Sequence, residues 1–96
     1  MNEYNLEIVK KIIMEVLDAT KNKSFIFGSF ATGNNNNTSD LDIGIEGEKL
    51  SGAIYFDLLE KFEDSNLPYS VDLVDFNTVN ENFKKIAKKK IIPLNF

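Results

Sequence analysis

Residues 25–44 read FIFGSFATGNNNNTSDLDIG, and the rest of the chain is organised around this stretch. It begins with an apolar, β-prone run, turns at a Gly-Ser pair, crosses a polar loop and ends at two aspartates separated by one residue. Glycine lets the backbone come close to a phosphate, and carboxylate oxygens are ligands that suit Mg²⁺. The stretch therefore predicts a metal site beside a phosphate site.

The composition limits the chemistry that the chain can perform. Its 96 residues suffice for a single domain, which we expect to span 1–96. The sequence has no Cys and no His, so disulfides, Cys/His zinc sites and histidine-based triads are excluded. All eleven basic residues are lysines, so no guanidinium is available to clamp a phosphate. An active site here must use carboxylates, hydroxyls, lysines and backbone groups.

The charge is acidic overall but unevenly distributed. The net charge of −4 argues against broad nucleic-acid binding. Residues 81–90 contain five lysines and one glutamate, so this segment is +4 and the remainder is −8. No apolar stretch approaches the ~20 residues that cross a bilayer, and the N-terminus lacks the pattern of a signal peptide. We expect a cytoplasmic protein.

The spacing of apolar residues predicts an α/β (α+β) fold with the order αβ(turn)βαβαβ. Helices are expected over roughly 3–19, 50–62 and 79–87, with a helical turn at 29–33. Strands are expected at 24–27, 40–46, 69–76 and 91–94, and the asparagine-rich residues 34–39 are expected to form a surface loop. Pro93 cannot donate a ladder hydrogen bond, so the last strand should lie at a sheet edge.

Three aspartates are the candidate metal ligands. Asp40 and Asp42 alternate with apolar residues, so they share one face of a strand about 6.5–7 Å apart. Asp72 joins them if its strand pairs beside theirs, because neighbouring strands lie ~4.8 Å apart. Asp75 falls on the opposite face from Asp72 and is expected to be solvent-facing or structural. Oxygen-only ligands of this kind suit Mg²⁺ or Mn²⁺ together with substrate phosphates.

Gly28 and Ser29 supply the candidate phosphate site. The glycine allows close backbone approach, the N–H groups that open the following turn point toward anions, and the serine adds a hydroxyl donor. Together with the carboxylates these groups indicate phosphoryl or nucleotidyl transfer assisted by two metal ions. Tyr55 and Phe56 are candidates for contact with a nucleobase, although packing in the core or against a partner is the simpler reading.

The combined motif resembles that of the minimal nucleotidyltransferases of the DNA-polymerase-β-like superfamily. The resemblance lies in Gly28-Ser29, the ten-residue spacer, Asp40-Leu-Asp42 and the later Val71-Asp72-Leu-Val74. It implies a polymerase-β-like palm, a small mixed sheet flanked by helices, that uses two Mg²⁺ ions to transfer NMP from NTP, in this case ATP, to a hydroxyl. It also implies that Asp40 and Asp42 bind both metals, that Asp72 binds the metal that activates the acceptor, and that Gly28 and Ser29 bind the triphosphate.

The chain departs from the family pattern inside the Gly-Ser turn, where Phe30 and Thr32 stand in place of basic residues. Lysines elsewhere or a partner would then have to meet the charge of the triphosphate. Members of this length resemble antitoxins that neutralise a helical HEPN-type toxin by contact or by adenylylating it. The resemblance therefore implies a HEPN-type partner in trans, and a homo- or hetero-oligomer.

Two other functions fit the same residues. One is a non-catalytic binding module that keeps the fold and neutralises its partner by contact, and the other is a transferase that acts on a small molecule or an RNA end. Five lysines near the C-terminus, Lys84, Lys85, Lys88, Lys89 and Lys90, could bind an acidic partner or RNA, or form a solvated face that complements the end of a helix.

Overall fold

The protein, described here over residues 1–96 by a computed structural model, contains four helices and a four-stranded mixed sheet. The helices are α1 (Glu3–Val16), α2 (Ser29–Thr32), α3 (Gly52–Glu63) and α4 (Glu81–Ala87). The strands are β1 (Asn22–Phe27), β2 (Leu41–Gly47), β3 (Val71–Asp75) and β4 (Ile92–Pro93). The predicted class and order of elements are confirmed. None of the helices is long and apolar enough to cross a lipid bilayer.

Several boundaries differ from those expected. The first helix ends at Val16 rather than near residue 19, because Leu17 adopts an extended backbone, although its N–H still donates to the carbonyl of Ile13. The first strand begins at Asn22, two residues early, since Asn22 already pairs with the end of β2. The second strand begins at Leu41, so the aspartate at position 40 lies just before it.

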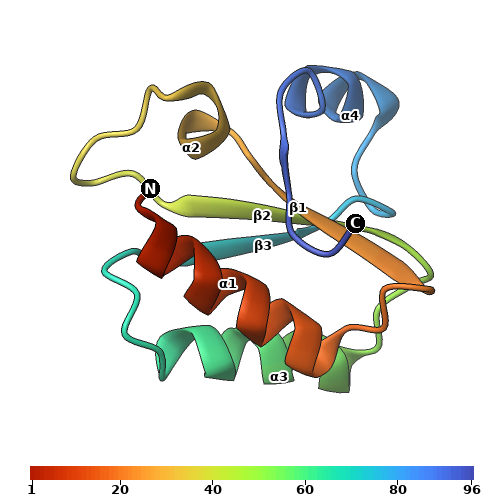
Figure 1. Cartoon of the computed structure of the whole chain (residues 1–96). Helices are drawn as coiled ribbons and strands as arrows, with labels where there is room; N and C mark the ends of the chain where they lie inside the picture. The colour runs from red at the N-terminus through yellow and green to blue at the C-terminus, as the bar shows by residue number, and fades with distance from the viewer.

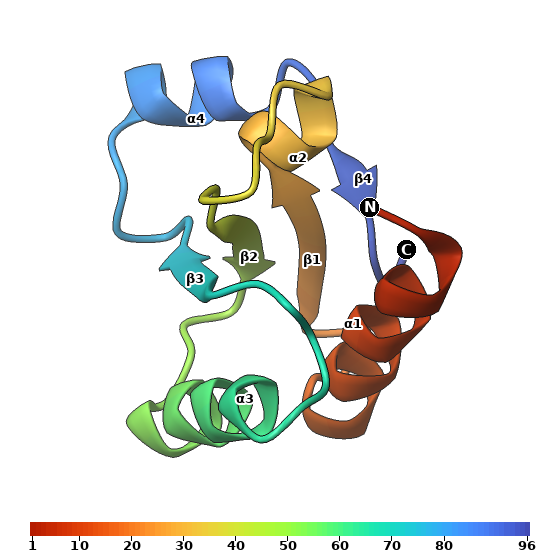
Figure 2. The same ribbon diagram turned by 90° about the vertical axis from the view of Figure 1, so that its left-hand side faces the viewer.

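The sheet has the strand order β3-β2-β1-β4. Strands β2 and β3 are parallel, whereas β1 is antiparallel to both of its neighbours. Strand β4 lies at one edge, beside β1 in Figure 2, so the edge position predicted from Pro93 is confirmed. Strand β3 forms the other edge, which leaves the side of β3 away from β2 without a strand partner.

Helices cover both faces of the sheet. Figure 1 shows α1 and α3 on one face and α2 and α4 on the other. Alternate residues of β2, namely Leu41, Ile43 and Ile45, point to the α1/α3 face and are almost completely buried there. They pack with apolar residues of α1 and α3 such as Val9 and Leu58. This face holds the main hydrophobic core.

A smaller aromatic cluster lies on the opposite face, beneath α4. It is built from Phe25, Phe27 and Phe76, with Phe76 packed edge to face against the other two at ring-centroid distances of 5.0 and 5.2 Å. Phe83 of α4 adds a fourth ring, 6.1 Å from Phe27 and 5.8 Å from Phe76. These edge-to-face contacts hold α4 over the sheet.

Gly44 is the position in β2 that makes room for the aromatic cluster. A Cβ at this residue would lie 2.6 Å from the ring of Phe25 and 2.7 Å from that of Phe76. Both rings are fully buried, so neither can move aside without displacing its neighbours. The strand therefore needs glycine here for packing, although its backbone is ordinary.

We predict that Gly44→Ala destabilises the fold by about 1–3 kcal/mol, the usual cost of overpacking a core. The measurement is the free energy of unfolding in urea. Gly52→Ala is the matched control, because a Cβ at Gly52 meets nothing within 4 Å. The control should be neutral or stabilising by up to about 1 kcal/mol. Equal stability of the two variants would contradict the packing assigned to Gly44.

Candidate active site

The sheet register brings two of the predicted aspartates side by side. Asp42 lies directly opposite Asp72 in the parallel pair of β2 and β3. On its other side, Asp42 lies opposite Phe27, the last residue of β1. The strands of Asp42 and Asp72 do pair, so the condition under which Asp72 is expected to join Asp42 is met. Asp40 comes two residues before Asp42 and immediately precedes β2.

These carboxylates lie on the sheet face that carries α2 and α4. Leu41 and Leu73, which flank Asp42 and Asp72 along their strands, point into the main core on the other face. Asp42 is half-buried, whereas Asp40 and Asp72 are exposed. No three acidic side chains converge closely enough to enclose a metal ion. The sheet register itself brings two of them together, Asp42 and Asp72. Mg²⁺ commonly takes only one or two carboxylates and completes its shell with phosphates and water.

The environment of Asp42 favours a cation. Desolvation raises the pKa of Asp42 above its usual value, and the negative charges of Asp72 and then Asp40 raise it further. A divalent cation beside these groups would offset both effects, since it attracts all three carboxylates. The donor set and its mutual repulsion therefore fit a hard cation such as Mg²⁺.

Gly28 joins β1 to α2 and lies directly against Asp42. Its φ of +73° is unfavourable for other residues, and a Cβ at this position would overlap the carboxylate oxygen of Asp42. Helix α2 begins at the next residue, Ser29, and the first N–H groups of a helix have no acceptor within it. The structure thus places the predicted phosphate turn immediately beside the predicted metal ligands.

The two departures from the family pattern in this turn have different surroundings. Phe30 is buried and packs against the ring of Tyr69 at 4.7 Å, so it anchors α2 to the sheet. Thr32 is exposed, and its hydroxyl donates to the backbone carbonyls of Ser29 and Gly28 at 3.3 and 3.4 Å. Position 30 is therefore a core position, and position 32 is the one open to solvent.

A cavity of about 400 Å³ lies beside Gly28, between α2 and α4. Its walls combine Phe27, Gly28 and Thr32 with Phe83, Ile86, Ala87, Lys89 and Lys90. The sequence did not reveal this cavity, because Phe83 and Ile86 show only the helical spacing of ordinary core residues. The cavity exists because α4 folds back over β1, a contact between segments more than fifty residues apart.

Three other candidates lie away from the site. Tyr55 of α3 packs on the main core and donates a hydrogen bond to the carbonyl of Leu73 at 3.4 Å. Phe56 is 68% exposed on the same helix. Since α3 covers the opposite face of the sheet, contact of either ring with a nucleotide at Gly28 is the wrong reading. The carboxylate of Asp75 accepts from the backbone N–H of Asn77 at 2.9 Å, which fits the expectation that Asp75 is solvent-facing or structural.

The mixed sheet, the glycine turn and the paired carboxylates are the features of a nucleotidyltransferase. A family model described as polymerase beta, nucleotidyltransferase, matches residues 7–94. The chain belongs to this family. It is also 38% identical, over 86 residues, to a probable protein adenylyltransferase, MntA, of Haemophilus influenzae, and the match covers 88% of this chain and 73% of that protein.

Solved structures share the fold. A crystal structure of a toxin–antitoxin with AMP-PNP superposes with a TM-score of 0.75 at 23% identity, covering 94% of this chain and 72% of that chain. A structure of a tri-AMPylated HEPN toxin in complex with an MNT antitoxin, from Shewanella oneidensis, gives a TM-score of 0.70 at 21% identity, covering 98% of this chain and 71% of that chain. At these identities the likeness concerns the fold.

We predict that Asp42→Asn raises the thermal stability of the metal-free protein at about pH 7. Because the pKa of Asp42 is raised on folding, ionising this residue destabilises the fold. The cost is absent below the unfolded pKa of 3.8, develops as the pH rises through the folded value, and persists at neutral pH.

The measurement is the difference in melting temperature between Asp42→Asn and the wild type across this pH range. The difference should vanish near about pH 3, where the wild-type side chain is protonated in both states. Addition of Mg²⁺ should stabilise the wild type more than the variant. A variant that is less stable than the metal-free wild type at neutral pH would contradict the desolvation and repulsion assigned to Asp42.

Proposed function

We propose that this protein is a Mg²⁺-dependent nucleotidyltransferase that moves AMP from ATP to a hydroxyl of a HEPN-type toxin protein and so acts as its antitoxin. The observation that carries the proposal is the pairing of Asp42 with Asp72 directly beside Gly28. The relative from Haemophilus influenzae, named as a probable protein adenylyltransferase, supports AMP as the transferred group. The AMPylated toxin bound to an antitoxin of the same fold supports the kind of acceptor.

Asp42 and Asp72, with Asp40 at the rim, would hold the divalent cations, and Mn²⁺ is an alternative to Mg²⁺ for such oxygen ligands. Bound there, the cations would neutralise phosphate charge and activate the acceptor hydroxyl. Of the three aspartates, Asp72 lies farthest toward the sheet edge and is exposed. It is therefore the carboxylate assigned to the acceptor side.

The chain's own groups position the donor nucleotide. The absence of a side chain at Gly28 lets the carboxylate of Asp42 lie against the turn, and the free N–H groups at the start of α2 together with the hydroxyl of Ser29 donate to the phosphate oxygens. This arrangement orients the α-phosphate toward the carboxylates. Positioning of this kind supplies much of the rate enhancement in phosphoryl transfer.

The acceptor comes from another molecule in this proposal. Asp72 faces solvent on β3, the strand that has no partner on its outer side, so a protein hydroxyl can approach it from that edge. The structural relatives that are complexes of an antitoxin with a HEPN toxin support a helical protein as the source of that hydroxyl. No groove for a small acceptor is needed in this arrangement.

We predict that Asp42→Asn and Asp72→Asn each reduce AMP transfer by at least about 100-fold, because metal-holding carboxylates act as one unit. The assay incubates the protein with α-labelled ATP, Mg²⁺ and a HEPN-type partner and follows label on the partner. Asp75→Asn is the matched control on β3, since its side chain points to the other face and an asparagine oxygen can still accept from Asn77.

The control should transfer AMP at the wild-type rate. Wild-type protein that never labels the partner, yet neutralises it by binding, would contradict the transferase function and favour the contact-only binding module. Equal loss in the Asp42 and Asp75 variants would contradict the assignment of the site to one face of the sheet.

A further inference from the structure

We propose that Lys89 and Lys90 bind the triphosphate of the donor nucleotide and replace the basic residue that the Gly-Ser turn lacks at Thr32. This inference rests on the proposed function, because it assigns a ligand group to the same site. It begins from the cavity between α2 and α4, in which Gly28 and Thr32 form one wall and the two lysines stand on another.

The position of Thr32 shows where a cation is missing. Phe30 is buried against Tyr69, so a basic side chain at that position would point into the core. Thr32 instead borders the cavity, and its short side chain bonds only to the backbone of its own turn. The cavity thus opens at the position where the family pattern has a basic residue, and in this chain the charge on its walls comes from the two lysines that follow α4.

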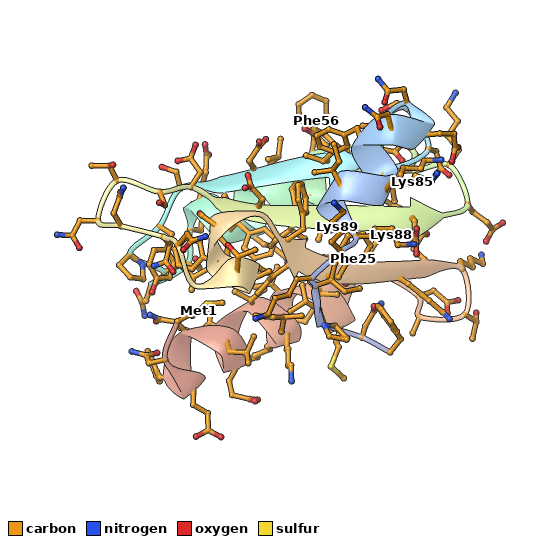
Figure 3. The ribbon with its side chains drawn as sticks, turned by 90° about the horizontal axis from the view of Figure 1, so that it is seen from above. Met1, Phe25, Phe56, Lys85, Lys88 and Lys89 are labelled. Carbon is orange, nitrogen blue, oxygen red and sulfur yellow. The ribbon has the colours of Figure 1, made fainter.

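Lys89 and Lys90 are the lysines of this segment that line the cavity. Lys84 is bonded to Glu81 at 3.2 Å, and Lys88 is bonded to Glu46 at 2.9 Å. Lys89 and Lys90 form no ion pair within the protein, so their charges are available to a ligand. In Figure 3, Lys89 lies nearer to α2 than Lys85 does.

The two lysines are held in place from both sides. Lys88, the residue before them, forms an ion pair with Glu46 of β2, and its ammonium lies 5.9 Å from the ring centroid of Phe25. After them, Ile92 pairs with Ile26 in the edge strand β4. The segment that carries Lys89 and Lys90 is therefore short and anchored. Anchoring of this kind reduces the backbone entropy lost when the segment binds an anion.

The carboxylates and the lysines lie on opposite sides of Gly28, which is the order that the metal-bound α-phosphate and the outer phosphates of a nucleotide require. Asp72 lies opposite Asp42 across the sheet, Gly28 follows the end of β1 and lies against the carboxylate of Asp42, and Gly28 also borders the lysine-lined cavity. An α-phosphate beside the carboxylates would thus direct the β- and γ-phosphates toward the cavity. The carboxylates would repel these anionic groups, and the lysine ammonium groups would offset that repulsion.

The test compares Lys89→Gln/Lys90→Gln, just after α4, with Lys84→Gln/Lys85→Gln, which removes the same charge from α4 itself at positions outside the cavity. Calorimetry measures the Kd of Mg-ATP and of inorganic tripolyphosphate with Mg²⁺. We expect the cavity variant to weaken both ligands by at least about ten-fold, since charge-assisted contacts to phosphate are lost. The control variant should change either Kd by less than about two-fold, because neither Lys84 nor Lys85 lines the cavity and charges away from a ligand are screened by solvent.

A rescue variant separates a phosphate role from a structural one. Thr32→Arg added to Lys89→Gln/Lys90→Gln returns a cation to the cavity wall and should recover most of the lost affinity for both ligands. Thermal unfolding of each variant shows whether α4 remains docked, and melting temperatures close to that of the wild type are expected because neither lysine is buried.

The outcomes are distinct. Weaker binding of ATP with unchanged binding of tripolyphosphate would overturn the assignment and place the nucleobase in the cavity. Unchanged binding of both ligands by the cavity variant would overturn it while leaving the proposed function intact. A wild-type protein that binds no Mg-ATP would overturn the proposed function and this inference together.

Discussion

The register of β2 between β1 and β3 is the constraint on which both the core and the site depend. Leu41, Ile43 and Ile45 are buried on the α1/α3 face, while Asp42 and Gly44 face α2 and α4. A slip of one residue would exchange these sets and drive Asp42 into the main core. Burial of an unpaired carboxylate costs several kcal/mol, so the hydrophobic alternation that stabilises the fold also fixes the position of the charged group.

The same register divides the sheet face that carries α2 and α4 into two parts. At one end, Gly44 lets the rings of Phe25 and Phe76 pack beneath α4, and this packing holds the helix against the sheet. At the other end, desolvation of Asp42 and the negative charge of the neighbouring Asp72 raise the pKa of Asp42. The aromatic packing at Gly44 therefore stabilises the fold, whereas the carboxylates at the other end of the strand destabilise it. The same aromatic packing holds α4 beside these carboxylates. Such unfavourable groups persist in folded proteins where function requires them.

Much of this arrangement follows from sequence alone. The alternation in residues 40–46 and 69–76 predicted which side chains share a face, and the resemblance to nucleotidyltransferases implied that Asp72 belongs with Asp42, which the strand pairing bears out. What the sequence could not supply depends on distant packing. Phe83 carries only a helical period in the sequence, yet in the fold it closes the aromatic cluster and brings Lys89 and Lys90 beside Gly28. Strand ends were also misplaced, because hydrogen bonding with a partner strand, as at Asn22, extends a strand beyond its apolar run.

The central claim is that metal and triphosphate meet where Gly28 lies against Asp42 and Asp72. It is tested most directly by a crystal structure of the protein with Mn²⁺ and a non-hydrolysable ATP analogue, in which anomalous scattering locates the metal. The account predicts Mn²⁺ bound by the carboxylates of Asp42 and Asp72, with the triphosphate against Gly28 and Ser29. Metal bound elsewhere, or a nucleotide seated on the α1/α3 face, would contradict it.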